Sequence, residues 1–479
     1  MIAADVAVVG AGPAGLAAAA EAARHGLSVA LLDDNPLPGG QYYRQGPATC
    51  GPDGAPAAGG KARDARRARE LLSVVGHPRM TFLPGAVVWA APEAHTLAFA
   101  RAGGGDRLRA EVIVIAAGAS DRAIPFPGWT LPGVITAGGA QNLLKSQGVL
   151  PGRRALVAGN GPLLLVVAES LRRAGATVVE VAEAASTRQA WRALPRLALA
   201  PRLLRRGLAY RLGLLRARIP FRPGHTVIEA RGRDEVAEAV VAPIDGAGRV
   251  DRARARTLAV DTVVVGFGLV PSTELTLLLG CRHEWRRARG GWMPSRSADL
   301  ETSVPGVLVA GDGGGIGGVE TAILEGRLAG LVAAERLGRC TRAEARAAGR
   351  RLRRRLRRLA HFREGIEAVH LPPADFLSLL TPETIACRCE QITAGQLDAA
   401  LGRGLPGIDA VKAHTRATMG RCQGRNCLGT LADLVARAHG CGPADLAWPR
   451  PRPPARPVRL GDVLGEDLPP ATGPESALP

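Results

Sequence analysis

Lysine and aromatic residues are scarce in this 479-residue sequence. Only Lys61, Lys145 and Lys412 are lysines among 62 basic residues, so the formal charge of +19 comes from arginine. Aromatic residues make up 3% of the chain and leave little for stacking on nucleic-acid bases. We therefore attribute the charge to a coding bias toward arginine and expect no nucleic-acid partner.

Long apolar segments are also missing. No stretch approaches the roughly eighteen uncharged residues that a membrane span requires, and LLLVV at 163–167 is far shorter. The N-terminal segment MIAADVAVVG has no basic stretch ahead of it, so no signal peptide is expected. Half of the eight cysteines are scattered and suggest no disulfide framework, which favours a reducing cytoplasm.

The stretch DVAVVGAGPAGLAAAAEAARHGLSVALLDD, residues 5–34, predicts a strand, a glycine turn, a helix, a second strand and an acid. Gly10 permits a tight turn, Gly12 lets the backbone approach a pyrophosphate, and Gly15 lets helix and strand pack closely. The helix N-terminus favours the phosphates, and Asp33 is placed to accept from ribose hydroxyls. We therefore expect a dinucleotide on Gly10, Gly12, Pro13, Ala14, Gly15 and Asp33.

Two later segments indicate that this dinucleotide is FAD. EVIVIAAGA (111–119) is a strand ending in small residues that include Gly118, and TSVPGVLVAGD (302–312) is a strand ending in Gly311 and Asp312. Both resemble the segments with which two-dinucleotide flavoproteins return to their first domain. The resemblance implies that Asp312 bonds the ribityl or phosphate region of FAD.

The strand–glycine–helix pattern recurs in RRALVAGNGPLLLVVAESLRRAGATVVEVAE, residues 153–183. Gly159 and Gly161 form the turn, and Glu183 follows at nearly the spacing of the first acid. Leu164 stands where the third glycine belongs, and we expect it to separate helix from strand and crowd a pyrophosphate. The segment predicts a NAD-type fold whose cleft takes NAD(P), another adenine nucleotide, or nothing. Neither nucleotide domain has paired cysteines, which argues against thiol–disulfide chemistry.

The other four cysteines gather near the C-terminus as Cys387-x-Cys389 and Cys422-x4-Cys427. Thiols at this density in a chain without a disulfide framework indicate a metal site. Zinc usually takes knuckles of different spacing, and His414 is the one histidine close enough to share such a site. Four thiolates also suit a [2Fe-2S] cluster, and an FAD that supplies electrons in pairs favours a one-electron carrier. We expect the cluster and keep zinc as the alternative.

The segments CRCEQITAGQLDAAL and VKAHTRATMGRCQGRNC resemble the small iron–sulfur domain first described in bacterioferritin-associated ferredoxin. PGGQYYR (38–44), IPFPGWTLPGVITAGGAQNLLKSQG (124–148) and VETAILEGRLAG (319–330) are similar to the α subunits of opine oxidase, D-hydroxyproline dehydrogenase and hydrogen cyanide synthase. The resemblance spans nearly the whole chain and adds Gly40 and Gln41 to the expected FAD site. Members of this family also show GPLLL, so Leu164 is not anomalous among them.

The expected fold is α/β: a Rossmann-like flavoprotein with two dinucleotide-binding domains and a small helical [2Fe-2S] domain. The FAD domain takes 1–150 and 258–335, with the NAD-type domain inserted at 151–257. A basic linker helix at 336–383 leads to the cluster domain at 384–442 and a proline-rich tail at 443–479. Within the linker, 342–358 holds nine arginines and one glutamate. Its apolar stripe predicts a packed helix, and a partner subunit or an anionic membrane face is the alternative use.

The motifs provide sites for two electron carriers but no recognisable residues for substrate chemistry. This combination predicts the FAD and [2Fe-2S] subunit of a hetero-oligomeric dehydrogenase. The family resemblance implies that a β-type flavoprotein subunit oxidises an amino or imino acid, while this chain relays electrons to an acceptor; a small third iron–sulfur subunit is a further partner. The first alternative is a stand-alone NAD(P)H oxidoreductase that feeds a ferredoxin-like acceptor. The second is a non-enzymatic chain whose last domain docks on an iron store.

Overall fold

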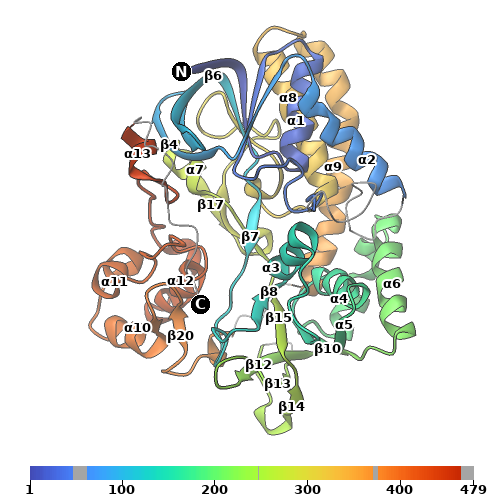
Figure 1. Ribbon diagram of the computed structural model, residues 1–479, viewed down its shortest axis with the longest axis vertical. Coiled ribbons are helices and arrows are strands. Elements are labelled where there is room, and N and C mark those ends of the chain that lie inside the picture. Colours follow the sequence, from blue (N-terminus) through green and yellow to red (C-terminus); the bar gives the residue numbers. More distant parts are fainter. Residues whose placement is uncertain (47–61, 246–247, 371–375, 465–479) are drawn as a thin grey trace, which may run out of the picture.

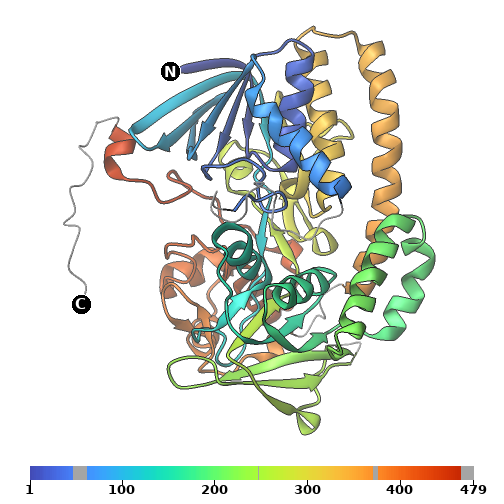
Figure 2. The same cartoon turned by 45° about the vertical axis from the view of Figure 1, so that its right-hand side comes forward.

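The computed structural model describes residues 1–46, 62–245, 248–370 and 376–464 (Figure 1). The segment GPATCGPDGAPAAGG at 46–60, whose composition predicts a loop, lies beyond Gly46 outside the described residues, as does the tail beyond 464. The described chain forms two sheet-based layers with a helical domain beside them, and the long helix α9 (Arg342–His370) stands at the opposite side of the molecule from that domain (Figure 2).

The first sheet contains seven strands and is assembled from two distant parts of the chain. Its order is β3 (Met80–Pro84), β2 (Val29–Asp33), β1 (Ile2–Val9), β6 (Gly104–Ile115), β5 (Thr96–Arg101) and β4 (Val87–Glu93). β19 (Val307–Val309) returns after the insertion and pairs in parallel with β6. Since β1, β2, β6 and β19 run in parallel, their carboxyl ends reach one edge, where parallel sheets hold their ligands.

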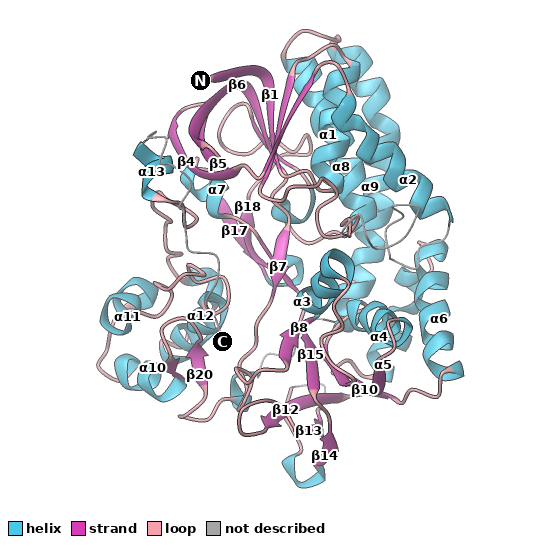
Figure 3. Ribbon diagram, in the orientation of Figure 1, coloured by secondary structure: helices cyan, strands magenta, loops and turns pink. Residues whose placement is uncertain are grey.

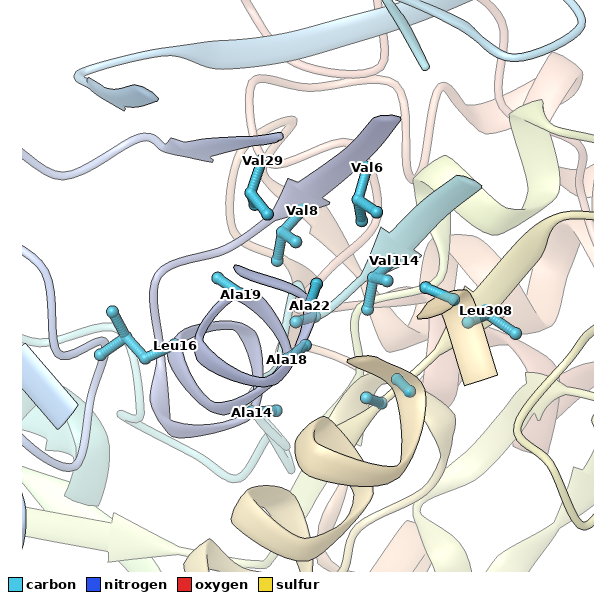
Figure 4. Close-up of a cluster of buried hydrophobic side chains, with 14 of the residues drawn as sticks. Val6, Val8, Ala14, Leu16, Ala18, Ala19, Ala22, Val29, Val114 and Leu308 are labelled. Atoms are coloured by element: carbon cyan, nitrogen blue, oxygen red, sulfur yellow. The ribbon is translucent and has the colours of Figure 1, made fainter. Parts of the chain in front are cut away.

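Alanine and glycine bring two helices close together above this sheet. α1 (Pro13–Arg24) packs its buried alanines on β1 and against α8 (Val319–Arg336), and the core also takes in Val114 and Leu308 (Figure 4). A Cβ added at Gly326 or Gly330 of α8 would collide with the α1 backbone. The small residues therefore let α1 and α8 approach closely, which fixes the glycine turn at the start of α1.

The NAD-type half has a five-stranded parallel sheet, which takes two of its strands from outside residues 151–257, the bounds expected for the inserted domain. Its order is β11 (Phe221–Pro223), β10 (Thr177–Glu183), β9 (Arg154–Gly159), β15 (Thr262–Gly266) and β8 (Val134–Thr136). Around it lie α3 (Ala137–Asn142), α4 (Leu163–Arg173), α5 (Thr187–Leu197) and α6 (Pro201–Arg216). An antiparallel sheet of β12 (His225–Arg231), β13 (Glu238–Pro243) and β14 (Arg256–Ala259) completes this half.

Two short antiparallel strand pairs lie outside the main sheets. β7 (Ala119–Asp121) pairs with β16 (Leu269–Pro271), and both lie where the chain crosses between the two sheets (Figure 3). β17 (His283–Arg286) pairs with β18 (Gly291–Pro294) next to the C-terminal domain. The short helices α2 (Ala62–Leu72) and α7 (Glu274–Leu278) belong to the FAD-type half, which is the half built on the seven-stranded sheet.

The basic segment 342–358 forms the first half of α9, which packs on α8 and, further along, on α5. Leu352 is buried in the first core, and Leu356 and Leu359 are partly buried against it. The apolar stripe of the arginine-rich segment is thus used for packing, while most of its arginines face solvent.

The C-terminal domain is small and helical. It contains β20 (Ile385–Cys387), β21 (Ile392–Thr393), α10 (Ala394–Leu401), α11 (Gly407–Thr415) and α12 (Leu428–Ala438) around a separate apolar core. The tail then returns to the first sheet: the Ala455 N–H donates to the Trp89 carbonyl at 2.8 Å, and α13 (Leu460–Leu464) lies beside β6. The fold class expected from the sequence is confirmed by this architecture.

Candidate functional sites

The glycine turn between β1 and α1 has the backbone geometry that its glycines predict. Gly10 has φ +104°, and a side chain there would collide with the Ala116 carbonyl. A Cβ at Gly15 would collide with the Gly10 carbonyl, so any larger residue would push α1 away from β1. At Gly12, by contrast, an added Cβ would meet nothing nearer than the Gly40 Cα at 3.9 Å. Gly12 therefore borders open space rather than packed backbone, which fits a pyrophosphate at that position.

Asp33 ends β2 and is 7% exposed. Its Oδ2 accepts from the Ala11 N–H at 2.5 Å, and Oδ1 accepts from the backbone and side-chain N–H groups of Asn35 at 2.8 and 2.9 Å. Burial raises the pKa of this carboxyl, and the Asn35 and Ala11 N–H groups oppose that rise. The acid is thus held against the glycine turn, beside the position expected for the adenosine ribose.

Three other predicted FAD residues, Gly40, Gly118 and Gly311, lie at the same sheet edge. A Cβ at Gly40 would lie 2.8 Å from the Gly12 Cα and 3.7 Å from Pro13, so the 38–44 loop touches the turn directly. A Cβ at Gly311 would lie 2.9 Å from that of Ala14. Gly118 lies in the same region, since a Cβ at the adjacent Gly313 would be 3.4 Å from its carbonyl. Segments far apart in sequence therefore form one small-residue cradle.

Asp312 lies beside this cradle and is held in place by hydrogen bonds to the backbone. Asp312 Oδ1 accepts from the N–H groups of Gly317 and Gly318 at 2.8 and 2.9 Å, which fixes the loop at the start of α8. Further along, in α8, Glu325 accepts the Gly311 N–H at 2.8 Å and forms a bidentate pair with Arg296 at 2.8 and 2.9 Å. Both side chains of that pair are at most 10% exposed. The sequence motifs did not identify Arg296 or Glu325, since neither lies in a fingerprint.

The second glycine turn is closed by the chain itself. Glu183 is 4% exposed and accepts from the Gly161 N–H at 3.3 Å. The last residue of α9 covers it: His370 Nδ1 lies 3.5 Å from Glu183 Oε1, and the His370 carbonyl accepts from Asn160 Nδ2 at 2.7 Å. Because these two contacts join residues about two hundred positions apart, the sequence pattern alone did not indicate them.

Leu164 does not crowd the pyrophosphate position as expected. Its side chain is fully buried in the core beneath α4, and its Cδ2 would lie 2.9 Å from a Cβ at Gly266 on the neighbouring strand β15. Glycine on the facing strand thus provides the room that the third fingerprint glycine usually provides. The expectation was wrong because it considered the helix and strand of the motif without β15.

The four clustered cysteines come together in the C-terminal domain. Cys387 and Cys427 are 1% and 3% exposed, with Sγ atoms 3.6 Å apart. Hydrogen bonds from the Cys427 thiol lower the pKa of Cys387 to about 6 and that of Cys422 to about 5, while donation to both raises the pKa of Cys427. Cys389 contacts Cys422. Such polarised thiols are suited to thiolate ligation.

A two-iron cluster fits this donor set. Among the described residues, no group of three or more His, Cys, Asp or Glu side chains is placed to hold a metal ion, so the cluster is inferred from the chemistry of the four thiols. A [2Fe-2S] cluster requires four cysteines in all and two at each iron, which is compatible with the pairs 387–389 and 422–427. Gly420 stands beside Cys389, where an added Cβ would collide with the cysteine side chain, so the two motifs approach closely.

The C-terminal domain is bound to the rest of the chain at specific points. Arg425, between the last two cysteines, pairs with Glu274 of α7, Nε to Oε1 at 2.7 Å. Trp129 Nε1 donates to the Ile385 carbonyl at 2.6 Å, two residues before Cys387. Trp448 lies against Trp285 and Trp292 of the β17–β18 pair, with centroids 6.3 and 5.6 Å apart. The domain therefore has a defined position beside the FAD-type half.

Fold and sites together define a flavin-dependent oxidoreductase with an iron–sulfur domain. Residues 4–326 match the family described as pyridine nucleotide-disulphide oxidoreductase, and residues 385–437 match the BFD-like [2Fe-2S] binding domain. The two families imply FAD and a [2Fe-2S] cluster as cofactors. Within the described residues, no helix is long and apolar enough to cross a membrane.

The chain belongs to the family that contains the A subunit of opine oxidase and the HcnB subunit of hydrogen cyanide synthase. It is 34% identical to the opine oxidase protein of Agrobacterium tumefaciens (strain Ach5), over 96% of this chain and 91% of the relative. It is 37% identical to the HcnB protein of Pseudomonas aeruginosa, over 94% and 96%. The resemblance noted in the sequence is confirmed, as is the role of an oxidoreductase subunit that works with other subunits.

Among solved structures, L-proline dehydrogenase from P. horikoshii has the same fold. It superposes with a TM-score of 0.71 at 21% identity and covers 96% of this chain and 79% of that one. This likeness covers the C-terminal part as well as the two nucleotide-binding folds.

Proposed function

We propose that this chain is the electron-transfer subunit of a complex that oxidises a carbon–nitrogen bond in an amino or imino acid of the opine, hydroxyproline or glycine type. The observation that supports this proposal is the fixed position of the four-cysteine domain: its Arg425 pairs with Glu274 of the FAD-type half, and its Ile385 carbonyl accepts from Trp129, which packs in the core of the NAD-type half. A fixed domain suits direct electron transfer, because a carrier that had to swing would need no such contacts. FAD, when bound, takes electrons in pairs, and the cluster passes them on singly.

The residues that we assign to FAD are Gly10, Gly12, Pro13, Ala14, Gly15, Asp33, Gly40, Gln41, Gly118, Gly311 and Asp312. The turn at Gly10–Gly15 would hold the pyrophosphate, and Asp33 the adenosine ribose. Two backbone N–H groups hold Asp312 through Oδ1, and we assign its Oδ2 to the ribityl chain. The assignment is supported by the cradle of glycines, which leaves space at Gly12 where packed residues would otherwise stand.

The partner that we propose is a β-type flavoprotein subunit that holds the substrate site, with a small iron–sulfur protein as a third subunit. Both relatives are named as subunits of larger enzymes, which supports such an assembly. Substrate oxidation requires a group that fixes the carboxylate and a pocket against the flavin ring. We place both on the partner, so that this chain conveys the electrons to the acceptor.

The complex is proposed to work in the cytoplasm, with a peripheral contact to the membrane. Supporting this contact, α5, α6 and the turn between them expose six large apolar side chains, Trp191, Leu194, Leu199, Leu208, Leu212 and Leu215. No acidic residue occurs from 184 to 228, while arginines are frequent there. Basic amphipathic surfaces of this kind bind anionic bilayers. Sedimentation with anionic but not neutral vesicles would be expected, and equal sedimentation with both would contradict it.

A stand-alone NAD(P)H oxidoreductase is the rival function, and His370 argues against it. In an NAD-type site the acid at the end of the second strand, here Glu183, must reach the ribose. In this chain that acid is buried beneath the end of α9. Rapid mixing of the oxidised protein with NADH or NADPH tests the choice. We expect no flavin bleaching on the millisecond-to-second scale at micromolar nucleotide. Fast bleaching by either nucleotide would favour the rival function.

A further inference from the structure

Thr418 is a buried polar residue in the loop between α11 and Cys422, and it is 6% exposed. Its hydroxyl oxygen, Oγ1, is shielded from solvent and has no hydrogen-bond partner within the described part of the chain. A buried hydroxyl without a partner is costly, because it gives up its hydrogen bonds to water and gains none in return. An acceptor for this hydroxyl is therefore expected in the functional protein.

The backbone of Thr418 is strained. Its φ is +73°, in the left-handed region, and its neighbours Arg416 and Gln423 also have positive φ, of +65° and +52°. A β-branched side chain is an outlier in this region, because its Cβ crowds the backbone carbonyl. Strained backbone of this kind is found at functional sites, where the surrounding structure holds it in place. The loop therefore holds Thr418 in one conformation at an energetic cost.

Thr418 stands between the two cysteine pairs. The hydrogen bond from the Cys427 thiol, and after it the one from the Thr418 N–H, lowers the pKa of Cys387, so this backbone N–H lies at the Cys387 sulfur. A Cβ added at Gly424, in the loop that joins Cys422 to Cys427, would lie 3.2 Å from the Thr418 Cβ. The backbone of Thr418 thus contacts the first pair, while its side chain lies against the loop of the second.

The sulfur atoms of an iron–sulfur cluster accept hydrogen bonds, and a threonine hydroxyl can donate one. A [2Fe-2S] cluster held by four thiolates is an anion, and its reduction adds one more negative charge. A donor beside a cluster sulfur stabilises the reduced form more than the oxidised form, and it therefore raises the reduction potential. Hydrogen bonds to the sulfurs are one of the means by which a protein sets this potential.

We propose that the buried hydroxyl of Thr418, held between the two cysteine pairs, donates a hydrogen bond to a sulfur of the [2Fe-2S] cluster and raises the reduction potential of that cluster. This role rests on the iron–sulfur assignment of the four cysteines, and it does not depend on the substrate or on the partner subunit. A higher potential makes the cluster a better acceptor, which suits the proposed direction of transfer from flavin to cluster.

A redox titration of the full-length protein, with the reduced cluster followed by electron paramagnetic resonance, tests this proposal. Thr418→Val removes the hydroxyl but keeps the size and branching of the side chain. At one fixed ambient potential, the ratio of reduced to oxidised cluster should fall about tenfold, which is about 59 mV for a one-electron carrier. Thr418→Ser keeps the hydroxyl and should keep the wild-type ratio. An unchanged ratio in Thr418→Val, or an equal fall in Thr418→Ser, would overturn the proposal.

Two further variants separate the hydroxyl from backbone strain and from general effects on the domain. Thr418→Gly should fold, because glycine adopts positive φ freely, yet its ratio should fall as in Thr418→Val. Thr430→Val, at a site on α12 that is 7% exposed, is the matched control and should keep the wild-type ratio. A wild-type ratio in Thr418→Gly, or a tenfold fall in Thr430→Val, would overturn the proposal.

Iron and acid-labile sulfide are measured in each variant. Zinc in place of iron would overturn the cluster assignment and this proposal with it. Iron-loaded variants with an unchanged ratio would overturn the role of Thr418 alone.

Discussion

Arg425, within the loop that joins Cys422 to Cys427, forms an ion pair with Glu274 in the first turn of α7. Both side chains are close to four-fifths buried, at 23% and 22% exposure. Arg425 also donates through Nη1 to the Cys422 carbonyl at 3.1 Å. One side chain therefore fixes the cysteine loop and attaches it to the FAD-type half.

We predict that Arg425 and Glu274 are energetically coupled. A double-mutant cycle of Arg425→Gln and Glu274→Gln, followed by denaturant unfolding, should give a coupling free energy of about 1–2 kcal/mol, because the pair is largely shielded from solvent. The exposed pair Arg66–Glu70, at 78% and 59% exposure, is the control and should give about 0.5 kcal/mol or less. Equal coupling free energies in both pairs would mean that the interdomain ion pair is no stronger than an exposed surface pair.

The glycine turn gives a second prediction. Gly12→Val should fold normally, because an added Cβ meets only the Gly40 Cα at 3.9 Å, but should lose FAD, since the side chain enters the pyrophosphate space. Flavin content by absorbance and secondary structure by circular dichroism are the two measurements. Gly207→Val on α6, where an added Cβ meets nothing within 4 Å, is the matched control and should retain flavin. A Gly12→Val protein with full yellow colour would refute the assigned site.

The cysteine quartet gives a third prediction. Cys387→Ser or Cys427→Ser should lose the visible absorption and the acid-labile sulfide of the cluster while the flavin stays bound. The last domain should also become less stable, since a small core gains part of its stability from a bound metal centre. Cys340→Ser, outside the quartet, should retain both cofactors. Stoichiometric zinc without iron in protein purified anaerobically would contradict the cluster.

Lys145 gives a prediction about pH. Burial, together with the charges of Arg44 and Arg206, lowers the pKa of Lys145 to about 8. Because this lies below the ordinary lysine value of about 10.4, the unfolded chain binds more protons between the two pH values, and stability should rise with pH through that window. Competitive acetylation followed by mass spectrometry should place half-reaction of Lys145 near pH 8. The denatured protein is the control, and an identical midpoint in both states would contradict the shift.

Local motifs were sufficient to predict the glycine turn after β1 and the approach of the four cysteines. Gly10, Gly12 and Gly15 lie within six positions, so their spacing reports directly on one strand–turn–helix unit. The contact between Leu164 and Gly266 could not be foreseen in that way, because it depends on which strand of the inserted sheet lies beside β9.

The contacts between domains could not be predicted from the sequence for the same physical reason. His370 reaches Glu183 only because α9 spans both halves, and no periodicity in the sequence reports where a long helix ends against another domain. Arg425 was visible in the motif C-Q-G-R-x-C, but its partner Glu274 was not. Contacts between separately folded units depend on their relative position, which sequence patterns of one unit do not contain.

The division of labour between subunits is the central claim, and steady-state turnover tests it most directly. The purified chain, with its FAD and cluster, is assayed with D- and L-amino acids, opines and hydroxyproline and an artificial electron acceptor. The same assay is then applied to the chain co-purified with the β-type flavoprotein subunit that we propose. We predict no turnover by the chain alone and turnover by the complex. Robust amino-acid dehydrogenase activity of the isolated chain would contradict the account, since it would require a substrate site within this chain.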